Sequence, residues 1–97
     1  MKIRILTPAS KELHEAYEYY ERQLNGLGKK FIESFKSSLD LIQKIPYGWR
    51  KISPKTRRIN FKGFPYLILY VLDEDEIIIT FICHSHRNPK YYKRHIQ

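Results

Sequence analysis

The sequence has little cysteine and no long apolar run. Its single cysteine, Cys83, cannot form a disulfide within the chain and stands among apolar residues, which fits a reducing compartment. No apolar stretch is long enough to cross a bilayer, and the first residues lack the apolar core of a signal peptide. We therefore expect a cytoplasmic protein that has no membrane partner.

The chain is also short, at 97 residues, which predicts one domain spanning residues 1–97. Apolar residues make up 42% of it and aromatic residues 14%, so the composition is that of a folded domain and not of a disordered chain. No internal repeat, linker or low-complexity segment interrupts the sequence.

Acidic residues are missing from two windows, residues 50–62 and 84–97, which hold ten of the eighteen lysines and arginines. The net charge of +8 favours polyanionic partners such as nucleic acid, the ribosome or an acidic protein. The cations are either separately solvated or form one basic face, and two acid-free windows favour the face. The candidate target-binding residues are Arg50, Lys51, Lys55, Arg57, Arg58, Lys62, His84, Lys90, Tyr92, Lys93 and Arg94.

The first half of the chain predicts a strand and two helices. Residues 2–6 alternate as a short strand does, and Thr7-Pro8 indicates a helix start, with the threonine as cap. Apolar residues then recur at helical spacing to residue 24, and residues 25–28 break the pattern. A second helix over residues 29–45 ends at Pro46 and Gly48. So short a break predicts an antiparallel helical hairpin.

The second half predicts strands. Residues 47–56 form a loop, and three strands follow at residues 57–61, 64–72 and 76–84, joined by turns too short for crossovers. The last strand is apolar on both faces, as expected for a strand covered on both sides. A short helix is expected from Asn88-Pro89 onward. The predicted fold is α+β, in the order β-α-α-β-β-β, with the hairpin packed on a small antiparallel meander sheet.

The aromatic residues divide into core and surface candidates. Their positions on apolar stripes assign Tyr17, Tyr20, Tyr66 and Tyr70 to the core. Tyr91, Tyr92 and Trp49 lie in or beside the acid-free windows and are candidates for stacking on bases or gripping a partner. For Trp49 the alternative is a loop residue folded down onto the core.

Two histidines, His84 and His86, share one face if the last strand continues that far. Neither a cysteine nor a carboxylate stands nearby in sequence to complete a metal site, so we expect no metal. Strand-end histidines bonded to backbone or water are the simpler interpretation, and proton transfer near neutral pH remains open to them.

A set of residues spread over nearly the whole chain matches one known family in a single register. These residues are Ala16, Tyr19-Tyr20-Glu21, Gly26-Leu27-Gly28, Phe31, Ile45-Pro46, Arg57-Arg58, Phe64-Pro65-Tyr66, Ile68, Tyr70, His84-Ser85-His86-Arg87-Asn88-Pro89, Tyr92 and Arg94. In this order they resemble the RelE/ParE toxin superfamily, especially its ParE-like, plasmid-stabilisation branch. The resemblance implies a toxin neutralised by a tightly bound antitoxin, which docks as a helix in a groove or as a strand on a sheet edge.

The resemblance leaves two targets open, because ParE-like members poison DNA gyrase and RelE-like members cut messenger RNA in the ribosomal A site. Cleavage needs a base, an acid and cations at the phosphate, but no metal or cofactor. The candidate catalytic residues are Arg87, Tyr91, Arg58, Arg57 and His86. Arg87 and Tyr91 stand roughly where RelE-like nucleases keep an arginine and a tyrosine, whereas Arg87-Asn88-Pro89 resembles the ParE-like pattern. We favour a non-enzymatic gyrase poison over a ribosome-dependent endoribonuclease or a regulatory nucleic-acid binder.

Overall fold

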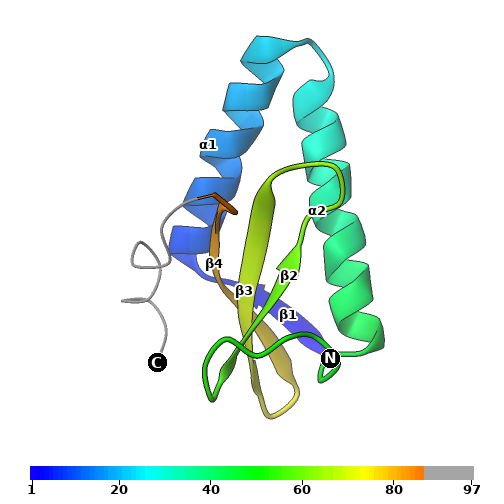
Figure 1. The fold of residues 1–97 in the computed structure, drawn as a ribbon, viewed down its shortest axis with the longest axis vertical. Coiled ribbons are helices and arrows are strands. Elements are labelled where there is room, and N and C mark those ends of the chain that lie inside the picture. The colour runs from blue at the N-terminus through cyan, green and yellow to red at the C-terminus, as the bar shows by residue number, and fades with distance from the viewer. Residues whose placement is uncertain (87–97) are drawn as a thin grey trace.

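The structure, a computed structural model, describes residues 1–86. It contains the six predicted elements in the predicted order (Figure 1). The expected C-terminal helix lies outside the described residues. Neither described helix is long and apolar enough to span a membrane. The elements are β1 (Lys2–Ile5), α1 (Thr7–Gln23), α2 (Leu27–Lys44), β2 (Thr56–Asn60), β3 (Tyr66–Asp73) and β4 (Glu76–His84).

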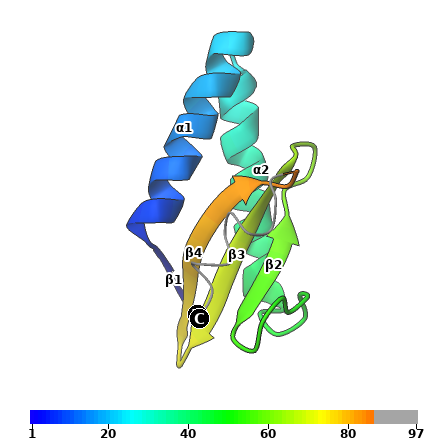
Figure 2. The same ribbon diagram turned by 60° about the vertical axis from the view of Figure 1, so that its left-hand side comes forward.

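The two helices run side by side as an antiparallel hairpin and cover one face of a four-stranded sheet (Figures 1 and 2). α1 contacts β4 and α2 contacts β2. β2, β3 and β4 form the predicted antiparallel meander. The partner of the first strand was not predictable from local pattern: β1 pairs in parallel with β4, from Lys2 opposite Glu76 to Ile5 opposite Ile79, which makes the sheet mixed.

Apolar side chains are buried on both faces of β4, as predicted. Ile77, Ile79 and Ile82 belong to the main core between sheet and helices. Phe81 and Cys83 belong to a smaller cluster on the opposite face, and the loop residue Ile52 packs against that cluster. Burial on both faces is the reason that β4 reads as one continuous apolar run.

A β-bulge in β4 changes which of its residues face the helices. Leu69 pairs with Phe81 and Tyr70 with Ile79, so Thr80 has no partner in the register. Its hydroxyl donates to the carbonyl of Leu69 at 3.2 Å. The extra residue moves the helix-facing positions from odd to even numbers. His84 therefore faces the helix side, where its ring lies 5.2 Å from that of Tyr66.

The starts of the two helices differ from the prediction. Leu6, not Thr7, occupies the N-cap of α1 and no side chain caps it, so the predicted threonine cap is wrong. α2 begins at Leu27 because the carboxylate of Glu21 accepts hydrogen bonds from the amides of Gly26 and Gly28, both at 3.0 Å. Gly26 has a left-handed φ of 91°, which suits glycine.

Candidate functional site: a cationic hollow at the sheet edge

The segment before β2 was predicted to be a plain loop, but it folds back on β2 as a hairpin arm. Lys51 forms an antiparallel bridge with Arg57. The amide of Arg58 donates to the carbonyl of Arg50 at 2.9 Å, and that of Ile52 donates to Thr56 at 2.9 Å. Pairing across this arm brings four cations of the first acid-free window together at one edge of the sheet, namely Arg50, Lys51, Arg57 and Arg58.

Arg57 holds the beginning of this loop. One terminal nitrogen of its guanidinium donates to the carbonyls of Tyr47 at 2.9 Å and Trp49 at 2.8 Å. Its carbon atom Cζ lies 5.7 Å from the centre of the Tyr47 ring, within cation–π range. Arg57 is half-buried, so these contacts make it a structural residue of the loop as well as a cation of the surface.

Tyr70 supports the same loop from the core side. It is fully buried, and its hydroxyl donates to the carbonyl of Pro46 at 2.8 Å. Burial raises the pKa of Tyr70 to about 12, and the nearby Arg57 partly opposes that rise. The hydroxyl therefore stays a neutral donor at physiological pH. Tyr17, Tyr20 and Tyr66 pack against the main core, so the predicted core role of all four tyrosines is confirmed.

Trp49 is folded down onto the core, which was the second of its two predicted roles. Its ring packs against the main cluster and its indole N–H donates to the carbonyl of Leu41 at 3.3 Å, near the end of α2. Trp49 also lines a hollow of about 390 Å³ between α2 and β2. In that hollow Arg58 donates to the side-chain oxygen of Asn60 at 2.9 Å, which leaves it a half-buried cation beside an apolar wall. The other lining residues are Leu41, Arg50 and Ile59.

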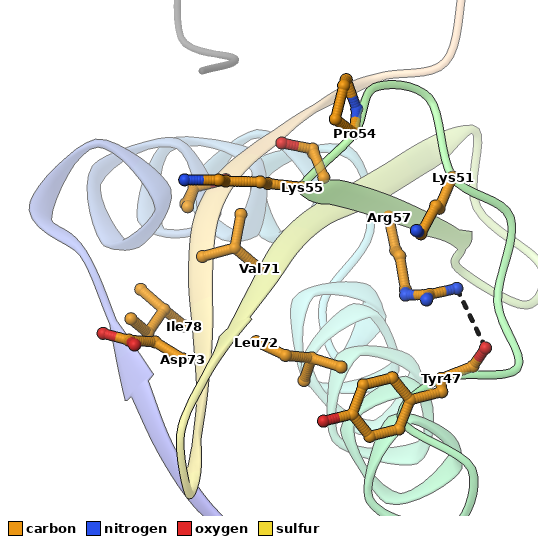
Figure 3. A pocket seen from close by; sticks show the side chains of 11 residues that line it. Tyr47, Lys51, Pro54, Lys55, Arg57, Val71, Leu72, Asp73 and Ile78 are labelled. Atoms are coloured by element: carbon orange, nitrogen blue, oxygen red, sulfur yellow. Dashed lines mark hydrogen bonds between the residues drawn. The ribbon is translucent and has the colours of Figure 1, made fainter.

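A second hollow, of about 530 Å³, is a notch in the edge of the sheet beyond the first residue of β2. Figure 3 shows Lys55, Val71, Asp73 and Ile78 to one side of β3 and Tyr47, Lys51, Arg57 and Leu72 to the other. Three cations and one acid therefore surround apolar side chains. Pro54, Thr56 and Thr80 complete the lining.

The predicted histidines lie at the opposite end of the sheet. β4 ends at His84, whose Nδ1 accepts a hydrogen bond from the backbone amide of His86 at 3.1 Å. Their rings are 5.1 Å apart. Within residues 1–86 no group of three histidine, cysteine, aspartate or glutamate side chains is placed to hold a metal ion.

The predicted site residues therefore separate into two groups. Arg57 is opposite Tyr70 and His84 is opposite Tyr66. Tyr70 and Tyr66 are four residues apart on β3, so these two cross-strand pairs are separated by about 13 Å at the usual strand rise. Lys62 follows β2 at the histidine end, where its carbonyl accepts a hydrogen bond from Ser34 at 2.7 Å. Arg87, Lys90, Tyr91, Tyr92, Lys93 and Arg94 lie outside the described residues.

Two features of this surface were missed by sequence reasoning. The bridge between Lys51 and Arg57 had no signal beyond the turn residues Ser53-Pro54. The notch exists because β3 runs two residues past its last pair with β2, and a strand's length relative to its neighbour depends on pairing between distant segments.

The family model described as the ParE toxin of the type II toxin–antitoxin system parDE matches residues 3–89. A chain of the chromosomal ParDE toxin–antitoxin system from P. aeruginosa superposes with a TM-score of 0.74 at 19% identity, covering 89% of this chain and 97% of that one. The isolated E. coli RelE toxin gives 0.61 at 15% identity, covering 96% and 93%. These two likenesses show a shared fold. No curated protein sequence is significantly similar to the chain.

Proposed function

This chain belongs to the ParE toxin family of type II toxin–antitoxin systems, and we propose that it arrests growth by poisoning DNA gyrase unless its antitoxin covers it. The family match over residues 3–89 carries the proposal. The greater likeness to the ParDE chain than to RelE supports the same branch. A cytoplasmic location follows from the proposed target.

The arrangement of the described cations also supports a poison that works by binding. Inhibition of an enzyme by contact requires a complementary surface, and the notch together with the Arg58 hollow offers exposed cations beside apolar walls. RNA cleavage would instead require an acid and a base gathered around one phosphate. Arg57, one of the proposed catalytic residues, is paired in the sheet about 13 Å from the pair that contains His84. His86, another of them, follows His84 in the turn after β4.

The decisive experiment is pulse labelling of DNA and protein synthesis within minutes of inducing the full chain without its antitoxin. We expect DNA synthesis to fail first, and the purified chain to inhibit supercoiling by purified gyrase. An unchanged rate of DNA synthesis while protein synthesis collapses would refute gyrase as the target. Growth that continues while the folded chain accumulates would refute the toxin activity itself.

A ribosome-dependent endoribonuclease is the second candidate, favoured by the shared fold with RelE. Its proposed catalytic pair is Arg87 and Tyr91, with Arg57 or Arg58 at the phosphate. The double substitution Arg87→Ala, Tyr91→Phe separates the two candidates. A nuclease should lose activity by orders of magnitude, whereas a poison should lose only the binding contribution of those side chains.

A further inference from the structure

Two arginines lie opposite each other where the hairpin arm pairs with β2. The bridge between Lys51 and Arg57 sets the register of the arm. In that register Arg50 lies opposite Arg58, and the amide of Arg58 donates to the carbonyl of Arg50 at 2.9 Å. Directly opposite residues of an antiparallel pair carry their side chains on the same face, with Cβ atoms about 5 Å apart. The two guanidinium groups therefore start from neighbouring positions.

The described residues leave the charge of this arginine pair uncompensated. Like charges directly opposite each other destabilise a strand pair. Within residues 1–86 neither Arg50 nor Arg58 forms an ion pair with a carboxylate. The residues that line the hollow between α2 and β2, to which both arginines belong, include no acid. An anion held between the two guanidinium groups would relieve their repulsion.

The hydrogen-bond donors of the pair match a phosphate group better than a carboxylate. Nη2 of Arg58 donates to the side-chain oxygen of Asn60 at 2.9 Å, which leaves Nε and the other terminal nitrogen for a ligand. Arg50 is exposed, and no side-chain hydrogen bond ties it to residues 1–86. A carboxylate has two oxygens and matches one guanidinium fork, whereas a phosphate monoester offers three oxygens and up to two charges to both arginines.

Apolar side chains form the other wall of the hollow. Leu41, near the end of α2, is 43% exposed, and Trp49 beside it is half-buried. The indole N–H donates to the carbonyl of Leu41 at 3.3 Å, which satisfies the one polar atom of that ring. The volume of about 390 Å³ is within the range of small-molecule sites. The hollow therefore suits an anion that carries an organic body.

We propose that this hollow binds a phosphate monoester carried by a small organic molecule. The phosphate oxygens accept hydrogen bonds from Arg50 and Arg58, and the organic part lies against Leu41 and Trp49. This ligand site goes beyond the proposed function and is independent of which target the toxin has.

A monoester fits the arginine pair better than the backbone of a nucleic acid strand. Each phosphodiester carries one negative charge and two unesterified oxygens, so it compensates only one of the two guanidinium charges. Binding of a strand also relies on stacking of bases on aromatic rings. The one aromatic ring of the lining, Trp49, packs against the main core.

The test follows NMR signals of the isotope-labelled full chain during titration with three probes at equal ionic strength. The probes are phenyl phosphate, the diester methyl phenyl phosphate, and inorganic phosphate. Trp49 is the only tryptophan of the sequence, so its indole N–H gives a single signal from the wall of the hollow. We expect phenyl phosphate to shift this signal and that of Arg58 Nε–H saturably. It should bind roughly tenfold more tightly than the diester and about fivefold more tightly than inorganic phosphate.

Matched variants locate the bound phosphate. Arg50→Gln with Arg58→Gln should weaken phenyl phosphate about tenfold or more, because both guanidinium groups are lost. Lys11→Gln with Arg22→Gln removes the same charge from exposed positions of α1 and should leave the affinity within about twofold. Arg58→Lys keeps the charge without the guanidinium fork and should weaken the probe about threefold or more. Arg50→Gln alone removes no side-chain hydrogen bond among residues 1–86, so it should weaken the probe without loss of folding.

The inference is overturned if phenyl phosphate leaves the Trp49 and Arg58 signals unchanged, or if the two double variants weaken it equally. Equal affinity for the diester would overturn the choice of a monoester, and equal affinity for inorganic phosphate would overturn the organic part. A short DNA strand that binds more tightly than phenyl phosphate, and only when it carries a 5′-phosphate, would overturn the small-molecule source. Failure of phenyl phosphate to bind together with intact growth arrest refutes this inference alone.

Discussion

The guanidinium of Arg57 donates a hydrogen bond to the carbonyl of Tyr47 at 2.9 Å and lies 5.7 Å from the centre of that residue's ring. One side chain of β2 thus fixes both the backbone and the ring of a residue ten positions earlier. The contact anchors the hairpin arm that carries Lys51, and so it sets one side of the notch.

Removing Arg57 should therefore cost more stability than removing its neighbour. Arg57→Ala leaves the carbonyls of Tyr47 and Trp49 without their donor, and we expect a loss of about 1–3 kcal/mol in the free energy of unfolding. Arg58→Ala loses one contact, to Asn60, and should cost about 1 kcal/mol or less. Urea denaturation measures both. Equal losses would show that the loop does not depend on Arg57.

The carboxylate of Glu21 should be the main determinant of the helical turn. Glu21→Ala removes the acceptor for the amides of Gly26 and Gly28, and should lower the free energy of unfolding by about 1–3 kcal/mol. Glu18→Ala on the same helix removes only an exposed pair with His14 and should cost roughly 0.5 kcal/mol or less. Thermal denaturation at equal salt compares the two, and similar melting temperatures would contradict the capping role.

Gly28→Ala should destabilise the hairpin although alanine is the better helix former. A Cβ at this position would lie 2.8 Å from Cε1 of Tyr17 and 2.9 Å from Oε1 of Glu21. Relief of that overlap should cost roughly 1–3 kcal/mol, more than the ~1 kcal/mol that alanine gains in helix propensity. The double variant Gly28→Ala, Tyr17→Ala is the control, because it removes the ring that alanine would strike. A measured stabilisation by Gly28→Ala alone would disprove the close contact.

Tyr70 should make the folded state sensitive to alkaline pH. Its pKa is about 12 in the folded protein and near 10 in the unfolded chain, so between those values only the folded state keeps the proton. The contribution of Tyr70 to stability should therefore be level below pH 10 and fall as pH rises from 10 toward 12. Tyr70→Phe should be less stable than wild type at pH 7, for want of the bond to Pro46, but should lose less on the alkaline side.

Urea denaturation from pH 7 to 11 tests this prediction. Tyr47→Phe, which removes a hydroxyl from an exposed ring, should keep the wild-type alkaline decline. If Tyr70→Phe declined as steeply as wild type, the decline would have to arise from other groups.

Local pattern alone determined the order of elements, the helical hairpin, the β2–β3–β4 meander and the burial of Tyr70. These features follow from periodicity and turn length, which neighbouring residues encode. For Trp49 the sequence left two alternatives, a surface role in binding or a place on the core, and in the structure its ring packs on the core.

Tertiary structure decided everything that depends on pairing between distant segments. The parallel pairing of β1 with β4, the bulge at Thr80 and the bridge between Lys51 and Arg57 have no local signature, because a strand's partner and register depend on the whole sheet. The same pairing placed Lys51 and Lys55 at one end of the sheet and His84 and His86 at the other. The sequence by itself determined that the chain carries a concentrated positive charge, and the register of its strands decided where on the surface that charge lies.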